Sequence, residues 1–314
     1  MPRTARQRSS SGIYHVMMRS ISDIKLFRNV IDKEVFLKFL KKYKESFLFN
    51  IYSYCIMDTH VHLVINSNGA DVSKFMHNIN QCYAQYYNKK YNRTGHVFGD
   101  RFKSTVATSD ISVLSMTAYV HNNPKDIKGY RNCVENYNYS SFNIYLGRCT
   151  DKYNLIDRNF ILSYFHSDPI LAAKHYYSFV KSRQSCDFTD LEITNPALLS
   201  SNKAASERTY TKPIIRNIHP KKIIEFISKY TNFDKSIINI KYRSASSEFR
   251  SLCAFFMRLF CNYNSDKIQK ALGNNISLSS IPLLCNKGYS LIKDNISYHN
   301  IIDDFVNSSS YEAI

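Results

Sequence analysis

Residues 55–65 constrain the fold more than any other stretch of this chain. They comprise an apolar segment, a short polar break and a second segment that opens with His60 and His62, as expected for a β-hairpin. Because side chains alternate faces along a strand, both histidines project from one face and Val61 and Leu63 from the other. Two imidazoles about 7 Å apart along a strand can reach one divalent metal ion. The pair is equally compatible with a half-exposed strand, so its meaning depends on a partner elsewhere.

A partner is present in residues 111–123, whose dense apolar residues predict a packed helix. Pro124 disfavours the helical conformation of the residue before it, so the helix is expected to end at Asn123. Tyr119 and Asn123 are four residues apart and share a helix face. A hydroxyl nucleophile and an amide oxygen thus lie one turn apart, in position to meet the histidines.

Four ordered blocks of sequence extend this pattern over about half of the chain. The blocks are Pro2-Arg3 through Tyr14-His15-Val16, Met57-Asp58-Thr59-His60-Val61-His62-Leu63, Gly95-His96-Val97-Phe98 with Arg101-Phe102-Lys103-Ser104, and Tyr119-Val120-His121-Asn122-Asn123-Pro124. Together they resemble the single-tyrosine HUH transposases, most closely the REP-associated tyrosine transposases and their insertion-sequence relatives. Four blocks at compatible spacing are much more specific than any one of them.

The resemblance implies a role for each matching residue. His60 and His62 correspond to the metal-binding pair, Tyr119 to the nucleophile and Asn123 to the third metal ligand. The implied cofactor is Mg²⁺ or Mn²⁺, of which Mn²⁺ tolerates nitrogen ligands better. The implied function is a metal-dependent transposase that cleaves and rejoins single-stranded DNA near hairpins or palindromic repeats through a 5′-phosphotyrosine intermediate. The implied partner is single-stranded or hairpin DNA, and the sequence leaves open whether a second copy of the chain is a partner as well.

The chain departs from the family pattern at two places. The family's usual Asn before the first histidine is Thr59 here, and its Arg-Gly after the first strand is Arg19-Ser20. Neither change removes a catalytic group, but both leave open a repurposed DNA-binding regulator that no longer cuts. An RNA-processing protein on the same fold is a third hypothesis. It accounts for the charge and the aromatic residues but leaves the pairing of Tyr119 with Asn123 unused.

The chain is strongly basic, with 42 Lys and Arg against 25 Asp and Glu and a net charge of +17. Phosphate contacts give sequence-independent affinity for nucleic acid, so a polyanion is the expected partner. The candidate DNA-binding residues are Arg3, Arg6, Arg101, Lys103 and His121. The first two belong to a basic N-terminal arm. The alternatives are basicity that serves solubility alone and, for His121, a structural role.

The predicted order strand–helix–hairpin–helix–strand–helix indicates an α+β fold, a ferredoxin-like (RRM-like) palm with an antiparallel sheet. Helices on one face of such a sheet would leave its other face free for a site. We expect the transposase domain at residues 1–150, a helical extension and linker at 151–213, a helical domain at 214–295 and a tail at 296–314.

The helical domain resembles the DNA-binding domain of the bacterial initiator DnaA. A short helix at residues 266–273 ends on Gly273, and another starts near Ser280 with Pro282 in its first turn. This order is typical of a helix-turn-helix, which would bind duplex DNA. The Arg-Asp-His that opens the recognition helix in that family is replaced by residues 274–277, so an ordinary helical packing domain is the alternative.

The eight cysteines contain no Cys-x-x-Cys pair, which argues against a structural zinc site and against a dense disulfide pattern. No signal peptide is recognisable before residue 12, and no apolar run approaches the roughly 18 residues of a membrane span. These patterns predict a cytoplasmic protein with reduced thiols and no membrane partner.

Overall fold

The structure is a computed structural model, which describes residues 12–21, 24–186, 214–240, 243–273, 276–308 and 311. The chain divides into two compact units. The first comprises Met1–Asn68 and Val72–Thr211, and the second comprises Lys212–Ile314 with Gly69–Asp71. Most of the expected linker, from residue 187 to residue 213, lies outside the described residues. Within the described ranges, none of the helices combines the length and apolar character that crossing a membrane requires.

One antiparallel sheet with the strand order β2-β3-β1-β4 forms the centre of the first unit. Its strands are β1 (Ile13–Arg19), β2 (Asn50–Ile56), β3 (His60–Asn66) and β4 (Lys103–Val106), with α1 (Val30–Phe47) between β1 and β2 and α2 (Val72–Lys90) between β3 and β4. Strands β2 and β3 form the expected hairpin. The unit therefore has the α+β, ferredoxin-like fold that the order of elements predicted.

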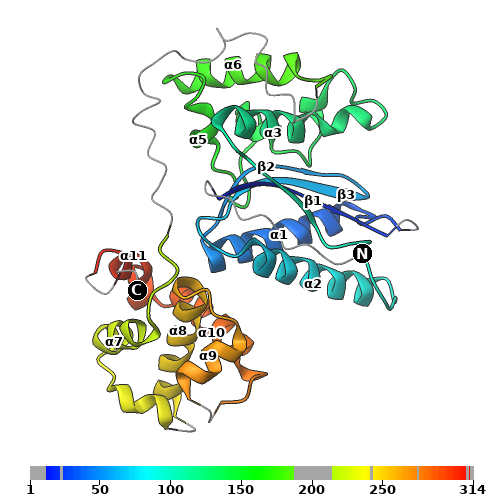
Figure 1. The fold of residues 1–314 in the computed structure, drawn as a ribbon. Coiled ribbons are helices and arrows are strands. Elements are labelled where there is room, and N and C mark those ends of the chain that lie inside the picture. Colours follow the sequence, from blue (N-terminus) through cyan, green and yellow to red (C-terminus); the bar gives the residue numbers. More distant parts are fainter. Residues whose placement is uncertain are drawn as a thin grey trace. The chain divides into compact units, whose positions relative to one another are not determined.

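Helices α1 and α2 cover one face of this sheet (Figure 1). Phe36 of α1 and Tyr83 of α2 are fully buried, and their rings meet edge to face with centroids 5.4 Å apart. The Tyr83 hydroxyl donates to the carbonyl of Leu26 at 2.7 Å, and the Tyr87 hydroxyl donates to that of Lys25 at 2.9 Å. Tyr83 and Tyr87 thus place their rings in the core and satisfy their hydroxyls on the backbone.

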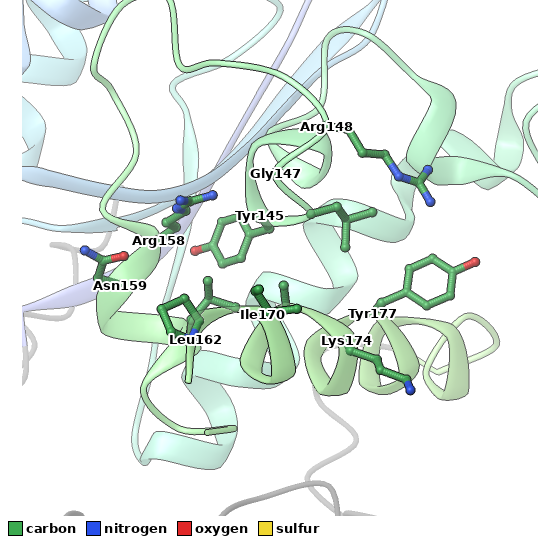
Figure 2. Close-up of a pocket in the computed structure, with 12 residues that line it drawn as sticks. Tyr145, Gly147, Arg148, Arg158, Asn159, Leu162, Ile170, Lys174 and Tyr177 are labelled. Atoms are coloured by element: carbon green, nitrogen blue, oxygen red, sulfur yellow. The ribbon is translucent and has the colours of Figure 1, made fainter. Parts of the chain in front are cut away.

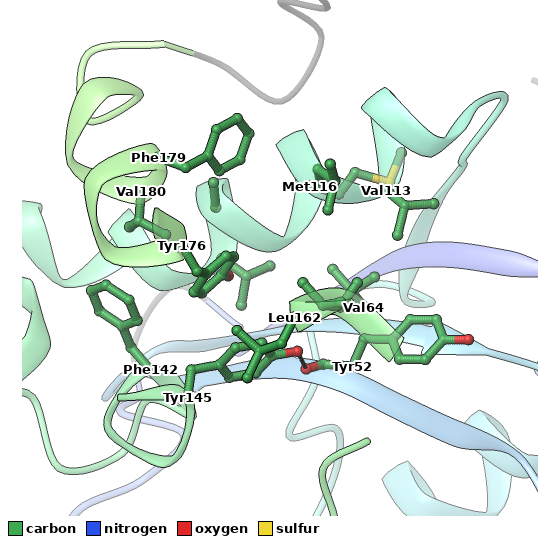
Figure 3. Packing of buried hydrophobic residues seen from close by; sticks show 14 of the residues in the cluster. Tyr52, Val64, Val113, Met116, Phe142, Tyr145, Leu162, Tyr176, Phe179 and Val180 are labelled. Atoms are coloured by element: carbon green, nitrogen blue, oxygen red, sulfur yellow. Dashed lines mark hydrogen bonds between the residues drawn. The ribbon is translucent and has the colours of Figure 1, made fainter. Parts of the chain in front are cut away.

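The opposite face of the sheet is covered as well, which differs from the open face expected from the sequence. Helix α3 (Asp110–Asn122) lies between the sheet and α6 (Pro169–Ser182) (Figure 1). Between them in the chain come η1 (Asn123–Asp126), η2 (Val134–Asn136), α4 (Phe142–Tyr145) and α5 (Arg158–Leu162). Val64 of β3 shares one buried cluster with Phe142, Tyr145 and Tyr176 (Figure 3). Because the extension buries apolar surface of the sheet, the first domain does not stop at residue 150 but includes α5 and α6.

The second unit is helical, as expected. Its elements are α7 (Pro220–Thr231), η5 (Lys235–Asn239), α8 (Ser244–Phe260), α9 (Ser265–Leu272), α10 (Ser280–Asp294), η6 (Ile296–Tyr298) and α11 (Ile301–Val306). The segment expected as a tail from residue 296 is part of this unit. Ile301 and Phe305 of α11 are fully buried, and the Phe305 ring lies 4.7 Å from that of Phe260 and 4.8 Å from that of Phe226 between centroids. Apolar contacts hold this segment in the core.

The close approach of α8 and α10 depends on Gly288. A Cβ added at this glycine would lie 2.2 Å from the backbone oxygen of Ser251 and 2.8 Å from the Cβ of Phe255. We expect Gly288→Ala to destabilise the second unit by about 3 kcal/mol, because forced overpacking costs roughly 1–3 kcal/mol and here the clash is with backbone. Urea unfolding followed by circular dichroism measures this effect. Ser290→Ala, on the exposed side of α10, is the control and should leave the midpoint nearly unchanged; equal midpoints for both variants would contradict the prediction.

Candidate active site

The two histidines of β3 lie side by side on the α3 side of the sheet. In the β1–β3 register His62 is paired with Met17 and His60 with Arg19, and Val64, on the same face, packs in the cluster beneath α3. The two imidazole centroids are 5.1 Å apart and their planes are nearly perpendicular. The alternation of the strand therefore places both rings together, as the sequence pattern predicted.

Tyr119 reaches the histidines from α3. Ser109 caps this helix by accepting a hydrogen bond from the backbone N–H of Ser112 at 3.2 Å. The Tyr119 ring lies against the edge of His62, with 5.7 Å between centroids and an interplanar angle of 78°. The fold thus brings a phenol and an imidazole together from elements more than fifty residues apart.

His15 is a third histidine in this cluster, although on sequence it belongs only to the first of the four family blocks and has no assigned role. Its Nε2 lies 3.0 Å from Nδ1 of His62, and the two rings are stacked with centroids 5.2 Å apart. The His15 and Tyr119 rings also meet edge to face, with centroids 5.6 Å apart. In the register His15 stands two positions from Met17, the partner of His62, so the two histidines are diagonal neighbours. Only this pairing of strands could have revealed the contact.

Asn123 begins the 3₁₀ turn η1 directly after α3. Its backbone stays helical, with φ −53° and ψ −34°, so the expectation that Pro124 would push it out of the helical region is wrong. The chain changes hydrogen-bond pattern at this point instead of leaving the helix. The Asn123 amide nitrogen donates to the carbonyl of Tyr119 at 2.8 Å. This bond fixes the amide one turn from the phenol and leaves the amide oxygen as the atom that a metal could use.

Both strand histidines are held neutral at neutral pH. Burial, together with the neighbouring His15 and His60 rings, lowers the pKa of His62 to about 2. Burial and then the positive charge of Arg19 also lower the pKa of His60, while Asp126 in η1 opposes the shift. Neutral imidazoles have a lone pair available for a metal ion.

These residues fit a divalent ion that is also bound by oxygen ligands. Nδ1 of His60 is 2.9 Å from the Thr59 hydroxyl, and Nδ1 of His62 faces His15, so the Nε2 atom of each ring is the one that could bind a metal. Among the residues that the structure describes, no three His, Cys, Asp or Glu side chains are grouped to hold a metal by themselves. An amide oxygen and phosphate or water oxygens would have to complete the coordination, as suits Mg²⁺ or Mn²⁺.

The candidate DNA-binding residues lie in different environments. Arg101 and Lys103 are exposed, and Lys103 is paired with Met17, which places its side chain on the histidine face of the sheet. Arg3 and Arg6 lie outside the described residues.

His121 is fully buried, so its assignment as a DNA contact is corrected here. Its Nε2 lies 2.7 Å from the Ser141 hydroxyl, and its Nδ1 lies 2.7 Å from the Tyr176 hydroxyl. The imidazole therefore links α3 to the segment before α4 and to α6. His121, although it belongs to the fourth family block, faces the core of the first unit, which the sequence alone did not reveal.

The burial of His121 predicts a loss of stability in acid. Burial lowers the pKa of this histidine from 6.5 to about 3. Below pH 6.5, therefore, His121 becomes protonated in the unfolded chain but stays neutral in the folded chain. Stability should therefore fall with pH in this window by about 1.4 kcal/mol per pH unit, or roughly 2 kcal/mol at pH 5. Urea unfolding of the wild type and of His121→Gln at pH 7 and pH 5 isolates this contribution. An identical pH dependence in both proteins would contradict the prediction.

A separate pocket of about 440 Å³ lies between α6 and the segment that follows α4 (Figure 2). Its lining residues include the cations Arg148, Arg158 and Lys174 and no carboxylate. The Arg158 guanidinium donates to the carbonyl of Ile144 at 2.7 Å, which ties one cation to the fold. Arg148 and Lys174 are exposed. The pocket is thus a basic hollow in the extension of the first unit.

Two comparisons find known proteins that are similar to part of this chain. Residues 8–123, which include the histidines and Tyr119, match a family model described as "Transposase IS200 like". A solved structure described as "Structure of the REP associates tyrosine transposase bound to a REP hairpin" is similar at 15% sequence identity and a TM-score of 0.40, covering 47% of this chain and 87% of that chain. The comparison with curated proteins gives no match. Residues 8–123 are thus similar to the IS200-like transposase family, which supports the resemblance noted from the sequence blocks.

Proposed function

We propose that this transposase domain cleaves and rejoins single-stranded DNA near hairpins through a covalent bond between Tyr119 and a 5′ phosphate. The observation that carries the proposal is the contact of the Tyr119 ring with His62, at 5.7 Å between centroids. A nucleophile and a neutral metal ligand that are distant in sequence meet on one face of the sheet. The match of residues 8–123 to a transposase family supports the same function.

His60, His62 and Asn123 would hold a Mg²⁺ or Mn²⁺ ion at this place. When bound, such an ion supplies Lewis-acid chemistry that polarises a phosphate and offsets charge in the transition state. The depressed pKa values of both histidines keep the rings in the form that can ligate. The bond from the Asn123 amide to the Tyr119 carbonyl ties the third ligand to the turn that carries the nucleophile.

In the cleavage step the phenol of Tyr119 loses its proton and its oxygen bonds to the phosphorus. The bond between that phosphorus and the 3′ oxygen of the preceding nucleotide breaks, and this oxygen takes up a proton to become a hydroxyl. The phosphodiester is retained as a phosphotyrosine. A 3′ hydroxyl can therefore attack it, release Tyr119 and join two strands without an external energy source.

Basic side chains around the first unit are the expected contacts to the DNA backbone. Lys103 lies in the same cross-strand row as Met17 and His62 and would contact a phosphate beside Tyr119. Arg101 is exposed just before β4. We assign Arg3 and Arg6 to the same role, and α9 with α10 to a helix-turn-helix that binds duplex DNA. A second copy of the chain is a further expected partner.

Covalent trapping tests the function. Purified full-length chain with Mn²⁺ should form a denaturant-resistant adduct with a DNA hairpin that has single-stranded flanks, and none with the matched RNA hairpin. An equal adduct with RNA would support an RNA-processing role. Binding of varied DNA hairpins without any adduct would support a regulator that no longer cuts.

A further inference from the structure

We propose that His15 is a positioning residue that fixes His62 in the tautomer and orientation required for metal binding. The inference rests on the proposed function, because it concerns the ligand that His62 would provide. It is carried by the 3.0 Å contact between Nε2 of His15 and Nδ1 of His62. His15 itself is assigned neither as a ligand nor as a nucleophile.

The chemistry of imidazole makes this contact selective. A neutral imidazole has one N–H and one bare nitrogen, so a hydrogen bond between two ring nitrogens needs the proton on one of them. If Nδ1 of His62 carries the proton, Nε2 of His62 has a free lone pair and can bind a cation. If Nδ1 of His62 accepts the proton of His15, Nε2 of His62 carries a hydrogen and cannot. Metal binding by Nε2 of His62 therefore requires Nε2 of His15 to accept the hydrogen bond from Nδ1 of His62. The proton of His15 is then on its own Nδ1.

The surroundings hold the His15 ring in place for this role. Its side chain is only 5% exposed, and its plane lies within 11° of that of His62. The centroid of the same ring is 5.6 Å from that of Tyr119, and the two planes are nearly perpendicular. His15 thus contacts the ligand on one side and the nucleophile on another, so it also sets their spacing. Outer partners of metal-binding histidines commonly have this orienting function.

His60 has a different partner, which makes the two ligands unequal. Its Nδ1 lies 2.9 Å from the hydroxyl of Thr59, at the position where the chain departs from its family. A hydroxyl can donate or accept, so it does not select one tautomer of His60. Only the contact of His62 with His15 links the tautomer of a ligand ring to that of its neighbour.

Two substitutions of His15 distinguish its role as a hydrogen-bond acceptor from its role as a packed aromatic ring. His15→Phe keeps an aromatic ring against His62 and Tyr119 but removes the acceptor. His15→Gln places an amide oxygen where it can accept from Nδ1 of His62. Binding of Mn²⁺ to the full chain without DNA, followed by electron paramagnetic resonance, should weaken about 10–100-fold in His15→Phe. It should stay within about threefold of wild type in His15→Gln, while thermal unfolding confirms that both variants fold.

The outcomes distinguish this inference from the function on which it rests. Unchanged Mn²⁺ affinity in His15→Phe, with affinity lost in His62→Ala, would overturn the role of His15 alone. An equal loss of Mn²⁺ affinity in His15→Phe and His15→Gln would show that His15 acts through packing, and would also overturn the proposed role. If the wild type does not bind Mn²⁺, the proposed metal site fails and this inference fails with it.

The tautomers of His15 and His62 can also be measured directly in the wild-type chain, without any substitution. Long-range ¹H–¹⁵N NMR spectra of the chain labelled at histidine report which ring nitrogen carries the proton. We expect the proton of His62 on Nδ1 and that of His15 on Nδ1. A proton on Nε2 of His62 would overturn the proposal.

Discussion

Tyr119→Phe should abolish the covalent DNA adduct and leave hairpin binding unchanged. The substitution removes one oxygen, and the ring can still pack against His15 and His62 at the observed 5.6 and 5.7 Å. Without the oxygen no phosphotyrosine can form, so adduct formation should fall by about a thousandfold or more, as expected when a covalent nucleophile is removed. Gel analysis of labelled hairpins with Mn²⁺ measures the adduct, and titration in EDTA measures binding.

Tyr130→Phe is the matched control for this change. Tyr130 is partly buried and packs against the same hydrophobic cluster as Tyr119. Its loss of a hydroxyl should leave the adduct at the wild-type level. Normal cleavage by Tyr119→Phe would reject Tyr119 as the nucleophile, and loss of cleavage in both variants would point to an effect on packing.

His62→Ala should remove metal-dependent cleavage while the chain still binds DNA. His62 is the only ring that contacts His60, His15 and Tyr119 together among the described residues. Removal of a direct ligand should cost more Mn²⁺ affinity than the roughly 10–100-fold expected for an outer partner. Cleavage rates over a range of Mn²⁺ concentrations, with binding measured in EDTA, check this result.

The control for this substitution is His96→Ala, because His96 is exposed in the segment before β4. It should cleave like the wild type at every Mn²⁺ concentration. Full activity of His62→Ala at low Mn²⁺ would contradict the metal site, whereas loss of hairpin binding in EDTA would assign His62 to DNA contact.

Local patterns predicted the main elements of the first unit. The alternation around His60 and His62 predicted β3, which begins at His60 as expected, and the dense apolar residues before Asn123 predicted α3. These features depend on neighbours along the chain, which a sequence displays directly. The family resemblance then related Tyr119 to the histidines, a relation that local pattern alone does not contain.

The features that sequence reasoning missed all depend on contacts between distant elements. His15 joins the site only because β1 pairs with β3 in one register. His121 is buried because α6 supplies Tyr176 as a partner and covers the helix. The second face of the sheet is occupied because Leu162 and Tyr176, which lie beyond the expected boundary at residue 150, pack in the same cluster as Val64 of the sheet. Periodicity reports which face of an element is apolar but not which element will cover it.

Mapping the adduct by mass spectrometry is the most direct test of the central claim, that Tyr119 attacks DNA beside the two strand histidines. Trypsin cleavage after Lys103 and Lys125 releases residues 104–125, in which Tyr119 is the only tyrosine. After reaction with a DNA hairpin and Mn²⁺, and digestion of the DNA, we expect the nucleotide mass on this peptide, attached at Tyr119. A nucleotide found on another residue, or a strand cut with no protein-bound nucleotide, would contradict the account.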